Sequence, residues 1–330
     1  MEIMKIFVVI ACFNGEKYID DCIHSLLQST VPVDIVAVEN ASVDTTLEKL
    51  RRYEPRITVL AQKKNLGFGI GNNAGAKYAM EHGADWILWL NMDTKIDPDC
   101  IRHLMEAASS LGSSAVFCPL PKTFSQILDL GFMSNTLSPQ PEKFGTRDFL
   151  TDLYEHRPLQ KYYTIDQISG AAIFISSKTL RHTGGFCDLF FPAYYEDAEL
   201  CRRLRYYGHI LYFIPDAVFF HDVENRSSSK IPFSFFLCGQ AYEDTLNPEL
   251  SFAQSYCQSI LLRFLKSVLF FLTLNPPRFK DEFSAFLMLV FMWARVRKKR
   301  KMVLRKESLG LKDSLDNVLF PCCLFRYIKR

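Results

Sequence analysis

Apolar runs alternate with stretches of helical spacing along the N-terminal third of the chain. The runs are rich in β-branched residues, and polar clusters typical of loops follow them. We predict buried strands over Lys5–Ala11, Asp34–Glu39, Ile57–Ala61 and Trp86–Leu90. Helices are predicted between them, including one over Val43–Tyr53 and one that ends near His82. This alternation indicates an α/β fold with a mostly parallel sheet and helices on both faces.

Four polar loops follow the predicted strands. They are Cys12–Glu16, Asn40–Ser42, the glycine-rich Asn65–Gly75 and Asn91–Thr94. The ligand site of such a sheet lies beyond the carboxyl ends of its strands. We therefore expect the four loops to meet at one edge and form a single site.

The pattern weakens between Cys118 and Tyr163, where proline, serine, glycine and charged residues dominate. We predict an irregular segment there that contributes a loop on the acceptor side. Order resumes near Ile168. Strands are predicted over Gly170–Ser176, His209–Ile214 and Ala217–Phe220, with helices over Ser177–His182 and Glu196–Tyr207.

The character of the chain changes beyond about residue 235. Two apolar stretches, Ser259–Leu274 and Phe283–Trp293, precede the basic run Arg295–Lys301. Arg263 and Lys266 interrupt the first stretch and the second is short, so we do not expect a spanning helix. Two amphipathic helices and a basic run favour an anchor on an anionic membrane surface. The alternative is a pair of helices packed on the first domain, with a solvated basic end.

Composition narrows the class of protein. The chain has 330 residues, is 48% hydrophobic and carries a net charge of +3, which predicts a folded protein and gives no reason to expect a nucleic-acid partner. Its ten cysteines show no repeated spacing and the first strand starts at once, so we expect a reduced, cytoplasmic protein. The predicted domains are 1–235, with halves of about 1–117 and 118–235, and a helical region over 236–330.

Five segments resemble family 2 glycosyltransferases of the GT-A-type fold, and among them the bacterial rhamnosyltransferase-like branch. The segments are Val8–Gly15, Val38–Asp44, Asn65–Gly75, Leu90–Thr94, and the parts of Gly184–His221 that include Tyr195–Leu204 and Pro215–Ala217. The resemblance covers about residues 4–225. It implies the nucleotide-diphospho-sugar transferase fold and a nucleoside-diphosphate sugar donor.

The resemblance assigns the donor to residues of the first four loops: Phe13, Asn14, Glu39, Asn40, Asn65, Gly67, Asn72 and Asn91. Glu39 would contact the nucleobase or ribose, although the family usually has aspartate there; its loop also reads as a helix cap. The glycines would let the backbone approach the nucleotide, and the alternative is a tight turn before a polar helix start. A dinucleotide fingerprint is excluded, because its spacing needs glycine at Asn72 and places the loop after the first strand.

The resemblance also implies a divalent metal, Mg²⁺ or Mn²⁺. Asp93 stands at the end of the family's metal-binding acid motif, and His221 would be a second ligand or contact the diphosphate. A carboxylate at the end of a buried strand suits this task, because the cation bridges a diphosphate and offsets charge on the leaving group. Taken alone, Asp93 is as often a turn residue, and an isolated His221 is more often structural.

Two acidic residues, Glu196 and Asp197, open the helix that ends at Tyr207. Acids in a first turn complement the helix dipole, and that reading accounts for Glu199. The resemblance assigns Asp197 as the general base on the acceptor hydroxyl, with Glu196 supporting the site. One carboxylate base and one metal suit direct displacement with inversion.

The predicted function is therefore an inverting glycosyltransferase that uses dTDP-rhamnose or a UDP-hexose. Its acceptor would be a glycan or lipid-linked hydroxyl in cell-surface polysaccharide or glycolipid biosynthesis, at the inner face of the cell membrane. A sugar nucleotidyltransferase is one alternative, but it would carry a glycine-rich basic loop in place of Cys12–Lys17. The other is a non-catalytic glycan-binding protein, which is expected to have lost Asp93, Asp197 or His221.

Overall fold

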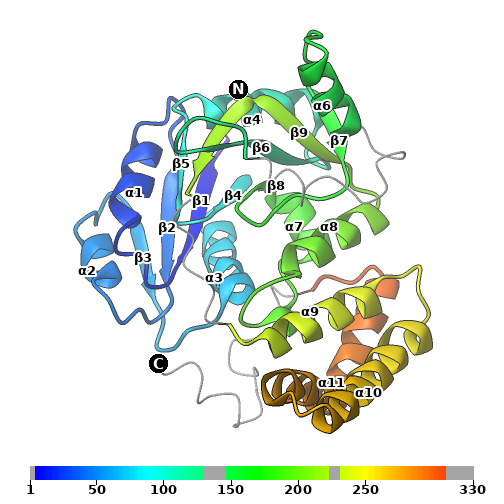
Figure 1. The fold of residues 1–330 in the computed structure, drawn as a ribbon. Coiled ribbons are helices and arrows are strands. Elements are labelled where there is room, and N and C mark those ends of the chain that lie inside the picture. The colour runs from blue at the N-terminus through cyan, green and yellow to red at the C-terminus, as the bar shows by residue number, and fades with distance from the viewer. Residues whose placement is uncertain (1–3, 130–145, 223–230, 310–330) are drawn as a thin grey trace.

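A computed structural model describes residues 4–129, 146–222 and 231–309 (Figure 1). Its centre is one nine-stranded sheet in the order β3-β2-β1-β4-β8-β6-β9-β5, and β7 pairs with β9 beside this path. The strands are β1 (Ile6–Cys12), β2 (Asp34–Glu39), β3 (Thr58–Ala61), β4 (Trp86–Leu90), β5 (Thr94–Ile96), β6 (Val116–Thr123), β7 (Tyr163–Ile165), β8 (Ala172–Ser176) and β9 (Leu211–His221). The first four coincide with the predicted strands to within one residue at each end. In β1, β2 and β4 nearly every residue is buried, and such apolar runs have few other ways to bury their side chains, whereas β3 is only partly buried.

The sheet is mixed, whereas the sequence predicted a mostly parallel one. Strands β1 to β4 are parallel, as expected. Strand β8, however, runs antiparallel to both β4 and β6, with Ala172 beside Leu90. The start of β8 therefore lies at the same edge as the end of β4, which brings the second half of the chain to the edge where the first loops meet.

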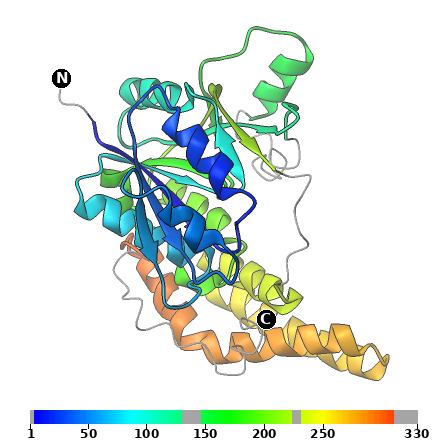
Figure 2. The same cartoon turned by 90° about the vertical axis from the view of Figure 1, so that its left-hand side faces the viewer.

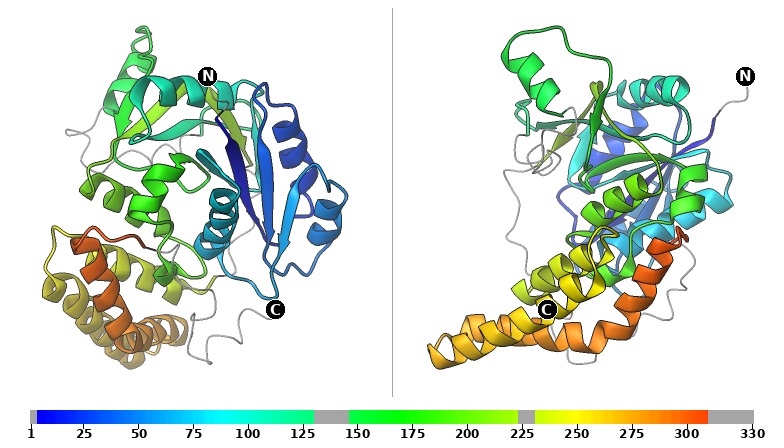
Figure 3. Two further views of the ribbon diagram at one scale, coloured as in Figure 1. Left: turned by 180° about the vertical axis from the view of Figure 1, so that it is seen from behind. Right: turned by 90° about the vertical axis from the view of Figure 1, so that its right-hand side faces the viewer.

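The helices cover both faces of the sheet. They are α1 (Ile19–Leu27), α2 (Thr46–Arg51), α3 (Phe68–Glu81), α4 (Cys100–Leu111), α6 (Thr146–Tyr154), α7 (Ser177–Thr183), α8 (Glu196–Tyr206), α9 (Phe233–Leu246), α10 (Gln258–Leu272) and α11 (Pro276–Leu304), with short helical turns η1 (Asp188–Phe190) and η2 (Ala253–Cys257). Helices α1 and α2 lie on one side of β1–β3 and α3 lies on the other, as the front and rear views agree (Figures 1 and 3).

The segment from Cys118 to Tyr163 is more regular than predicted in its described part. It holds most of β6 and the helix α6, whose Phe149 is 2% exposed; residues 130–145 lie outside the described residues. The two predicted strands around Pro215 are one strand, β9. The predicted break coincides with a shift of register between β6 and β9, where Pro119 pairs with Ile214 and Leu120 with Val218.

The C-terminal helices pack against the rest of the protein through a second hydrophobic core. Leu189 and Phe190 of η1 join side chains of α9 and α11 in this core. It includes Tyr242, Leu289 and Val296, all buried. The helical region is thus attached to the loop that precedes α8 and is not suspended from the sheet by a linker.

The basic run predicted to meet lipid is largely used inside the protein. Arg295 and Lys299 both pair with the buried Asp188, at 2.5 and 3.3 Å. Arg300 donates to backbone carbonyl oxygens of Thr245, Asn247 and Leu250. The expectation of a continuous basic lipid-binding surface is therefore wrong for these three residues, because an ion partner far away in the sequence holds two of them and backbone carbonyls hold the third.

Helices α10 and α11 form a hairpin that projects from the body of the protein (Figure 2). Its outer surface exposes large apolar side chains, among them Leu265, Leu269, Phe271, Leu272, Leu274 and Phe291. Arg263 and Glu282 form a buried ion pair between the two helices at 3.1 Å. The continuous helical stretch Ala253–Leu272 is long and apolar enough to cross a membrane when judged by length and composition alone, and 22% of an 18-residue window within it is buried.

Candidate active site

The loops after β1 and β2 are locked together by hydrogen bonds at the predicted edge. The backbone N–H of Asn14 donates to Ser42 Oγ at 3.0 Å, and Asn14 Oδ1 accepts from the N–H of Val43 at 2.9 Å. The N–H of Gly15 donates to Thr46 Oγ1 at 2.8 Å. Asn14 has a positive φ of 51°, a conformation that asparagine tolerates better than most residues. These bonds fix a two-loop wall, with the partly buried Phe13 at its start.

Asp44 fastens the base of this wall. Its carboxylate accepts from the N–H groups of Glu16 and Thr46, at 3.2 and 3.0 Å. Burial opposes the charge of Asp44, but hydrogen bonds from Thr46 and Glu16 outweigh it and lower the pKa of this carboxyl. The wall is therefore built around an ionised aspartate.

Glu39 lies at the end of β2 with 2% of its surface exposed. Its Oε1 accepts from the N–H of Ser42 at 2.6 Å and its Oε2 from the N–H of Ala41 at 3.2 Å. Glu39 therefore shapes the loop that would hold a nucleobase, and its carboxylate already has backbone donors. Its direct contact with the donor stays a prediction.

The glycine-rich segment is mostly helix, not loop. Helix α3 starts at Phe68, so Gly67 is the one glycine of this segment that lies before the helix. Gly67 has a φ of 77°, and its N–H donates to Asn65 Oδ1 at 2.7 Å. A Cβ on Gly71 would lie 2.7 Å from Asn40 Nδ2, and one on Gly75 would lie 2.3 Å from Val9 Cγ1. These two glycines allow α3 to lie close to β1 and β2, which is a packing role. The approach of the backbone near Gly67 to a nucleotide stays a prediction.

Asn40 and Asn72 are buried behind this wall, at 2% and 1% exposure. Asn40 Nδ2 donates to Gly67 O at 3.3 Å, and Asn72 Nδ2 donates to Phe68 O at 3.1 Å. Within the described residues, Asn40 Oδ1 and Asn72 Oδ1 are buried acceptors without a hydrogen-bond donor. Both side chains hydrogen-bond to the start of α3. In this conformation Asn72 is buried too deeply to contact the sugar nucleotide directly.

The predicted metal motif, residues 91–93, stands beside the first loop. A Cβ on Gly15 would lie 2.4 Å from Met92 Sδ, so the two loops are in contact. The N–H of Asn91 donates to Ala171 O at 2.9 Å, and Asn91 O accepts from Thr94 Oγ1 at 2.5 Å. The motif is thus held between the loop after β1 and the start of β8.

His221 ends β9 and lies between two carboxylates. Its Nε2 is 3.6 Å from Asp93 Oδ2 and its Nδ1 is 3.4 Å from Asp129 Oδ2. His221 is 2% and Asp129 4% exposed. The structure therefore brings the two predicted ligands, Asp93 and His221, together, and it adds Asp129, which sequence reasoning missed because it lay in the segment predicted to be irregular.

This arrangement fits a divalent cation that is shared with a ligand. Among the residues described, Asp93 Oδ1 is a buried oxygen without a hydrogen-bond donor. No group of three or more His, Cys, Asp or Glu side chains there is arranged to hold a metal by itself. Mg²⁺ is commonly held by one or two carboxylates together with substrate phosphates. The residues present suit that mode and not an all-protein cage.

Lys17 brings a positive charge near the same motif. Its side chain is fully exposed, with Nζ 4.3 Å from the centre of the Tyr18 ring. A hydrogen bond with Tyr18 and the charges of Asp222 and Asp93 raise the pKa of Lys17. Sequence reasoning weighed this lysine only as part of the loop.

The second carboxylate pair, Glu196 and Asp197, opens α8 as predicted. Asp197 Oδ2 accepts from the N–H of Gly170 at 2.9 Å and Oδ1 accepts from the N–H of Ala198 at 2.8 Å. Burial raises the pKa of Asp197, against the effect of these backbone donors. Asp197 is half-buried, and backbone donors orient both of its carboxylate oxygens.

Glu196 points inward and is 6% exposed. Burial, and then the neighbouring charge of Asp197, raise the pKa of Glu196 well above the ordinary range. In the described part of the chain its Oε2 is a buried atom without a hydrogen-bond partner. Burial therefore disfavours the charged form of Glu196, beside an aspartate that is the more exposed of the two.

The loop before this pair is strained. Tyr194 and Tyr195 both have positive φ, of 86° and 72°, which is unfavourable for aromatic residues. The close approach of Gly239 in α9 holds the loop, since a Cβ there would lie 2.9 Å from the Tyr195 ring. The conformation that presents Asp197 therefore depends on the C-terminal helices.

A short chain of contacts joins the two carboxylate centres. Asn91 of the metal motif binds Ala171 through its backbone, and the preceding Gly170 binds Asp197. Asp93 and Asp197 therefore belong to one edge of the sheet and are connected through the start of β8.

Glu199 has a different role from the one that we predicted. It is 3% exposed and pairs with the fully buried Arg203, with Nε to Oε1 at 2.7 Å. Arg203 also donates to the carbonyl oxygens of Thr183 and Gly185, at 2.5 and 2.7 Å. The pair fixes α8 to the turn at 183–185 and does more than complement the helix dipole.

Residues 7–176 match the model of the family described as glycosyl transferase family 2. Among curated proteins, the chain is 25% identical over 234 residues to N-acetylglucosaminyl-diphospho-decaprenol L-rhamnosyltransferase of Mycobacterium tuberculosis, a match that covers 65% of this chain and 75% of the relative. It is 26% identical over 228 residues to dTDP-rhamnosyl transferase RfbF of Shigella flexneri, covering 68% and 71%.

Two solved structures share the fold. The S. aureus protein TarS, residues 1–349 in complex with UDP-GlcNAc, superposes with a TM-score of 0.52 at 17% identity, over 92% of this chain and 88% of that one. This chain spans 44% of the longer TarS structure. The mannosyltransferase PcManGT of Pyrobaculum calidifontis, in complex with GDP-Man and Mn²⁺, has a TM-score of 0.51 at 13% identity, over 94% and 76%.

Proposed function

The chain belongs to glycosyl transferase family 2, and from that premise we propose that it transfers a sugar from a nucleoside-diphosphate donor to an acceptor hydroxyl with inversion at the anomeric carbon. The predicted family, the GT-A-type fold and the class of enzyme are confirmed by the family match and the shared fold. Family membership favours transfer over the nucleotidyltransferase and non-catalytic alternatives.

One observation supports the mechanism most. Asp197 is oriented by Gly170, and Asn91 of the metal motif is bound to the adjoining Ala171. A general base must lie within hydrogen-bond reach of the acceptor hydroxyl, and the donor diphosphate must lie on the opposite side of the anomeric carbon. The contacts through residues 170–171, just before β8, support the proposal because they link a candidate for each task.

In the proposed reaction Asp197 takes the proton of the acceptor hydroxyl. At the same time the oxygen of that hydroxyl forms the bond to the anomeric carbon. The bond from that carbon to the diphosphate breaks on the other face, which inverts the configuration. Glu196 is buried beside Asp197, where burial disfavours a second negative charge. Glu196 is thus a positioning residue.

Asp93 and His221 would hold Mg²⁺ or Mn²⁺ together with the donor diphosphate. Such an ion, when bound, offsets the charge that develops on the leaving diphosphate. We further propose that Asp129 orients His221, because it faces Nδ1 and leaves Nε2 directed to Asp93. A carboxylate behind a metal-binding histidine fixes its tautomer and raises its basicity.

The wall formed by residues 13–16 and 39–46 would bind the nucleoside. Asn65 and Gly67, which precede α3, would form one border of this binding site. The two curated relatives named above favour dTDP-rhamnose as donor over a UDP-hexose, and the name of the first favours a lipid-linked acceptor. The proposed place is the biosynthesis of a cell-surface polysaccharide or glycolipid.

We also propose that the enzyme is cytoplasmic and lies on the inner face of the cell membrane through the α10–α11 hairpin. The exposed apolar residues of the hairpin and the exposed Arg278 near its tip suit the boundary between headgroups and acyl chains. The apolar tip of the hairpin, and not the basic run, provides the contact with the membrane lipids.

The deciding experiment supplies the purified protein with Mn²⁺, N-acetylglucosaminyl diphosphate on a polyprenyl chain, and either dTDP-L-rhamnose or UDP-glucose. We expect dTDP release with formation of a disaccharide whose new linkage has the anomeric configuration opposite to that of the donor, measured by NMR. If transfer occurs from UDP-glucose and not from dTDP-L-rhamnose, the proposed donor is wrong and UDP-glucose takes its place. Retention of configuration would refute the mechanism.

A further inference from the structure

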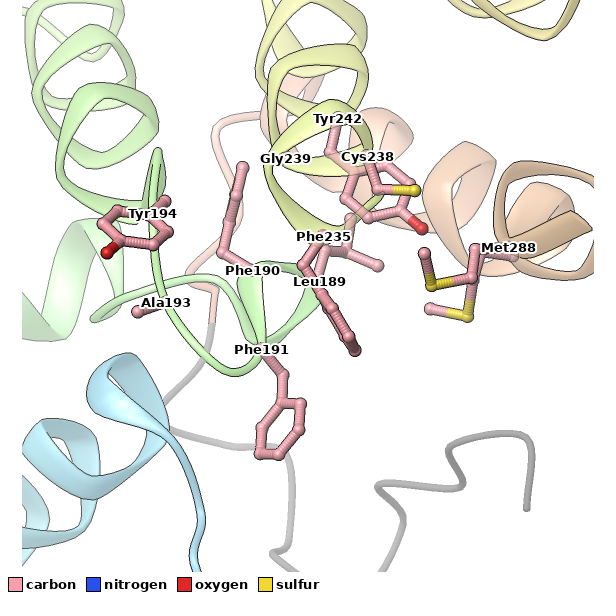
Figure 4. A pocket seen from close by; sticks show the side chains of 11 residues that line it. Leu189, Phe190, Phe191, Ala193, Tyr194, Phe235, Cys238, Gly239, Tyr242 and Met288 are labelled. Atoms are coloured by element: carbon pink, nitrogen blue, oxygen red, sulfur yellow. The ribbon is translucent and has the colours of Figure 1, made fainter. Parts of the chain in front are cut away.

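Three exposed aromatic residues form one aromatic surface beside the loop that leads to α8. Tyr194 of the loop is 40% exposed, and Phe233 and Phe236 of α9 are 52% and 38% exposed. The Tyr194 and Phe236 rings lie edge to face with their centroids 6.0 Å apart. The Phe233 ring lies 5.7 Å from the Phe236 ring, at an angle of 14°. The loop and α9 meet here, because Tyr194 and Gly239 line the same small hollow (Figure 4).

The spacing of residues in α9 turns this surface toward solvent. Phe233, Phe236 and Gln240 share one side of the helix, because residues three and four apart are neighbours on a helix, and all three are exposed. Another side of α9 carries Cys238 and Tyr242 into the second hydrophobic core. The two phenyl rings are thus left outside that core, with an amide side chain at their border.

A strained backbone holds Tyr194 on this surface. Tyr194 and Tyr195 have φ of 86° and 72°, angles that bulky side chains seldom adopt. Strain of this kind is concentrated at functional sites. The Tyr195 ring is 5.0 Å from the Phe236 ring, and a Cβ on Gly239 would lie 2.9 Å from it. The loop and α9 therefore present Tyr194 and Phe236 as one unit.

The aromatic surface lies close to the candidate base. Tyr194 precedes Asp197 by three residues, so their Cα atoms are at most about 11 Å apart. Helix α8, which Asp197 opens, is also attached to α9: Arg202 pairs with Glu243 and donates to its carbonyl oxygen at 3.0 Å. An acceptor hydroxyl at Asp197 therefore brings its own sugar, or the next one along a glycan, within range of the aromatic surface.

The chemistry of this surface matches a sugar ring. A pyranose has faces made of C–H groups and a rim of hydroxyls. The C–H faces stack on aromatic rings, whose faces carry partial negative charge, and the hydroxyls need hydrogen-bonding groups beside them. The Tyr194 hydroxyl and the Gln240 amide both donate and accept hydrogen bonds. The hairpin, by contrast, exposes apolar side chains such as Leu265 and Phe291, which suit lipid.

We propose that the aromatic surface is an acceptor subsite, on which a sugar ring of the acceptor stacks while its hydroxyl is delivered to Asp197. The inference rests on the proposed function and deepens it, because it assigns recognition of the acceptor sugar to Tyr194, Phe233 and Phe236. No bond forms or breaks at this subsite. It therefore acts on the affinity for acceptor and not on the chemical step.

Saturation-transfer difference NMR tests the subsite without turnover. The probes are the methyl glycosides of glucose, N-acetylglucosamine and rhamnose, each added to the intact protein with Mg²⁺ and dTDP. We expect saturation chiefly on the C–H protons of one ring face. Phe236→Leu should raise the Kd about tenfold, the size of one lost ring contact, while Phe236→Tyr keeps the ring and should bind as the wild type does. No saturation of any probe, or equal affinity in both variants, would overturn the proposal.

A kinetic test separates this inference from the proposed function. With the acceptor of the deciding experiment, Phe236→Leu should raise KM for the acceptor about tenfold and leave kcat and KM for the sugar nucleotide unchanged. Tyr154→Leu changes an aromatic residue of α6 that is 87% exposed and should alter none of these values. A lowered kcat with unchanged acceptor KM would overturn the subsite and leave the proposed transfer intact. Probe binding that depends on Phe236, in a protein that transfers no sugar, would support the subsite and refute the transfer.

Discussion

The backbone N–H of Gly170 donates a 2.9 Å hydrogen bond to Asp197 Oδ2. A Cβ at Gly170 would lie 3.1 Å from the Phe68 ring and 3.7 Å from the Asp197 Cβ, so the absence of a side chain allows this approach. The bond leaves Asp197 oriented and partly exposed, which is the condition that a general base needs before acceptor arrives.

Asp197→Asn should therefore lower turnover by roughly a hundredfold or more while donor binding survives, because the amide keeps the shape and loses the basicity. Initial rates and donor calorimetry measure the two effects. Since burial raises the pKa of Asp197, the wild-type rate should fall as pH decreases through a value above the ordinary aspartate range. Loss of donor binding would instead assign Asp197 to the nucleotide or metal site.

Glu196→Gln is the matched control for this change. Glu196 is buried and burial raises its pKa well above the usual range, so its charged form is disfavoured and a neutral amide is a mild replacement there. We expect a much smaller loss of turnover than in Asp197→Asn. The opposite ranking of the two variants would transfer the role of base to Glu196.

Chelation with EDTA should abolish transfer, and Asp93→Ala should do the same, because Asp93 supplies the carboxylate beside His221. Asp99→Ala removes a carboxylate that contacts Thr30 and Arg102 and should keep its activity. The measurement is initial rate with and without added Mn²⁺. Undiminished turnover after exhaustive chelation would disprove metal dependence.

Asp129→Asn should weaken Mn²⁺ binding about tenfold to a hundredfold, because His221 loses the partner of its Nδ1. Titration of Mn²⁺ in the presence of dTDP, followed by electron paramagnetic resonance, reports this affinity apart from turnover. Asp152→Asn alters another buried aspartate, one that accepts from Tyr163 Oη at 2.9 Å, and should leave Mn²⁺ affinity unchanged. An equal loss in both variants would indicate general destabilisation.

Phe271→Ser with Leu272→Ser should reduce binding to phospholipid vesicles about a hundredfold, since two large apolar side chains contribute roughly 3 kcal/mol when they leave water. Both are exposed, by 64% and 71%. Tyr154→Ser changes a residue of α6 that is 87% exposed and should bind vesicles as the wild type does. Flotation with vesicles separates these outcomes, and unchanged flotation of the double variant would exclude the hairpin as the anchor.

Truncation after about residue 250 is a poor test of that anchor. It would remove α11, whose Leu289 and Val296 share a core with Leu189 and Phe190 beside the candidate base. Loss of membrane binding and loss of the active loop would then occur together.

Arg203→Met should lower the free energy of unfolding by about 3–5 kcal/mol, because it leaves Glu199 buried without its cation. Arg52→Met breaks a pair of the same i,i+4 spacing, Arg52 with Glu48, whose side chains are 65% and 67% exposed. That change should cost at most about 1 kcal/mol. Thermal and urea unfolding measure both, and similar values would show that Arg203 is not a structural anchor.

The first four strands and the opening of α8 could be predicted because local pattern decides them. Strand β6 could not, since Pro119 and Pro121 argue against a strand interior. They are tolerated because β8 pairs only with Val116 and Phe117, so the missing N–H groups of the prolines interrupt no hydrogen bond to β8. The start of α3 was misplaced for a similar reason: glycines that resemble a loop are required there by contact with Asn40 and Val9.

The rest of the site depends on contacts that are distant in sequence. Asp129 meets His221, and Asp188 meets Arg295, across segments that carry no local signal of pairing. In the sequence, an arginine or lysine that forms a buried ion pair cannot be distinguished from one on the surface. For this reason the pairing inside the basic run and the role of Asp129 both required three-dimensional information.

The interleaving of β8 between β4 and β6 has a consequence for protein engineering. A chimera that exchanges residues 118–235 with those of a relative would replace the middle of the host's sheet and with it the Gly170 contact to Asp197. Donor preference and acceptor preference therefore cannot be changed independently by exchanging segments of this sheet. Grafts that start in α9 would preserve every strand of this sheet, because α9 to α11 follow β9 in the chain.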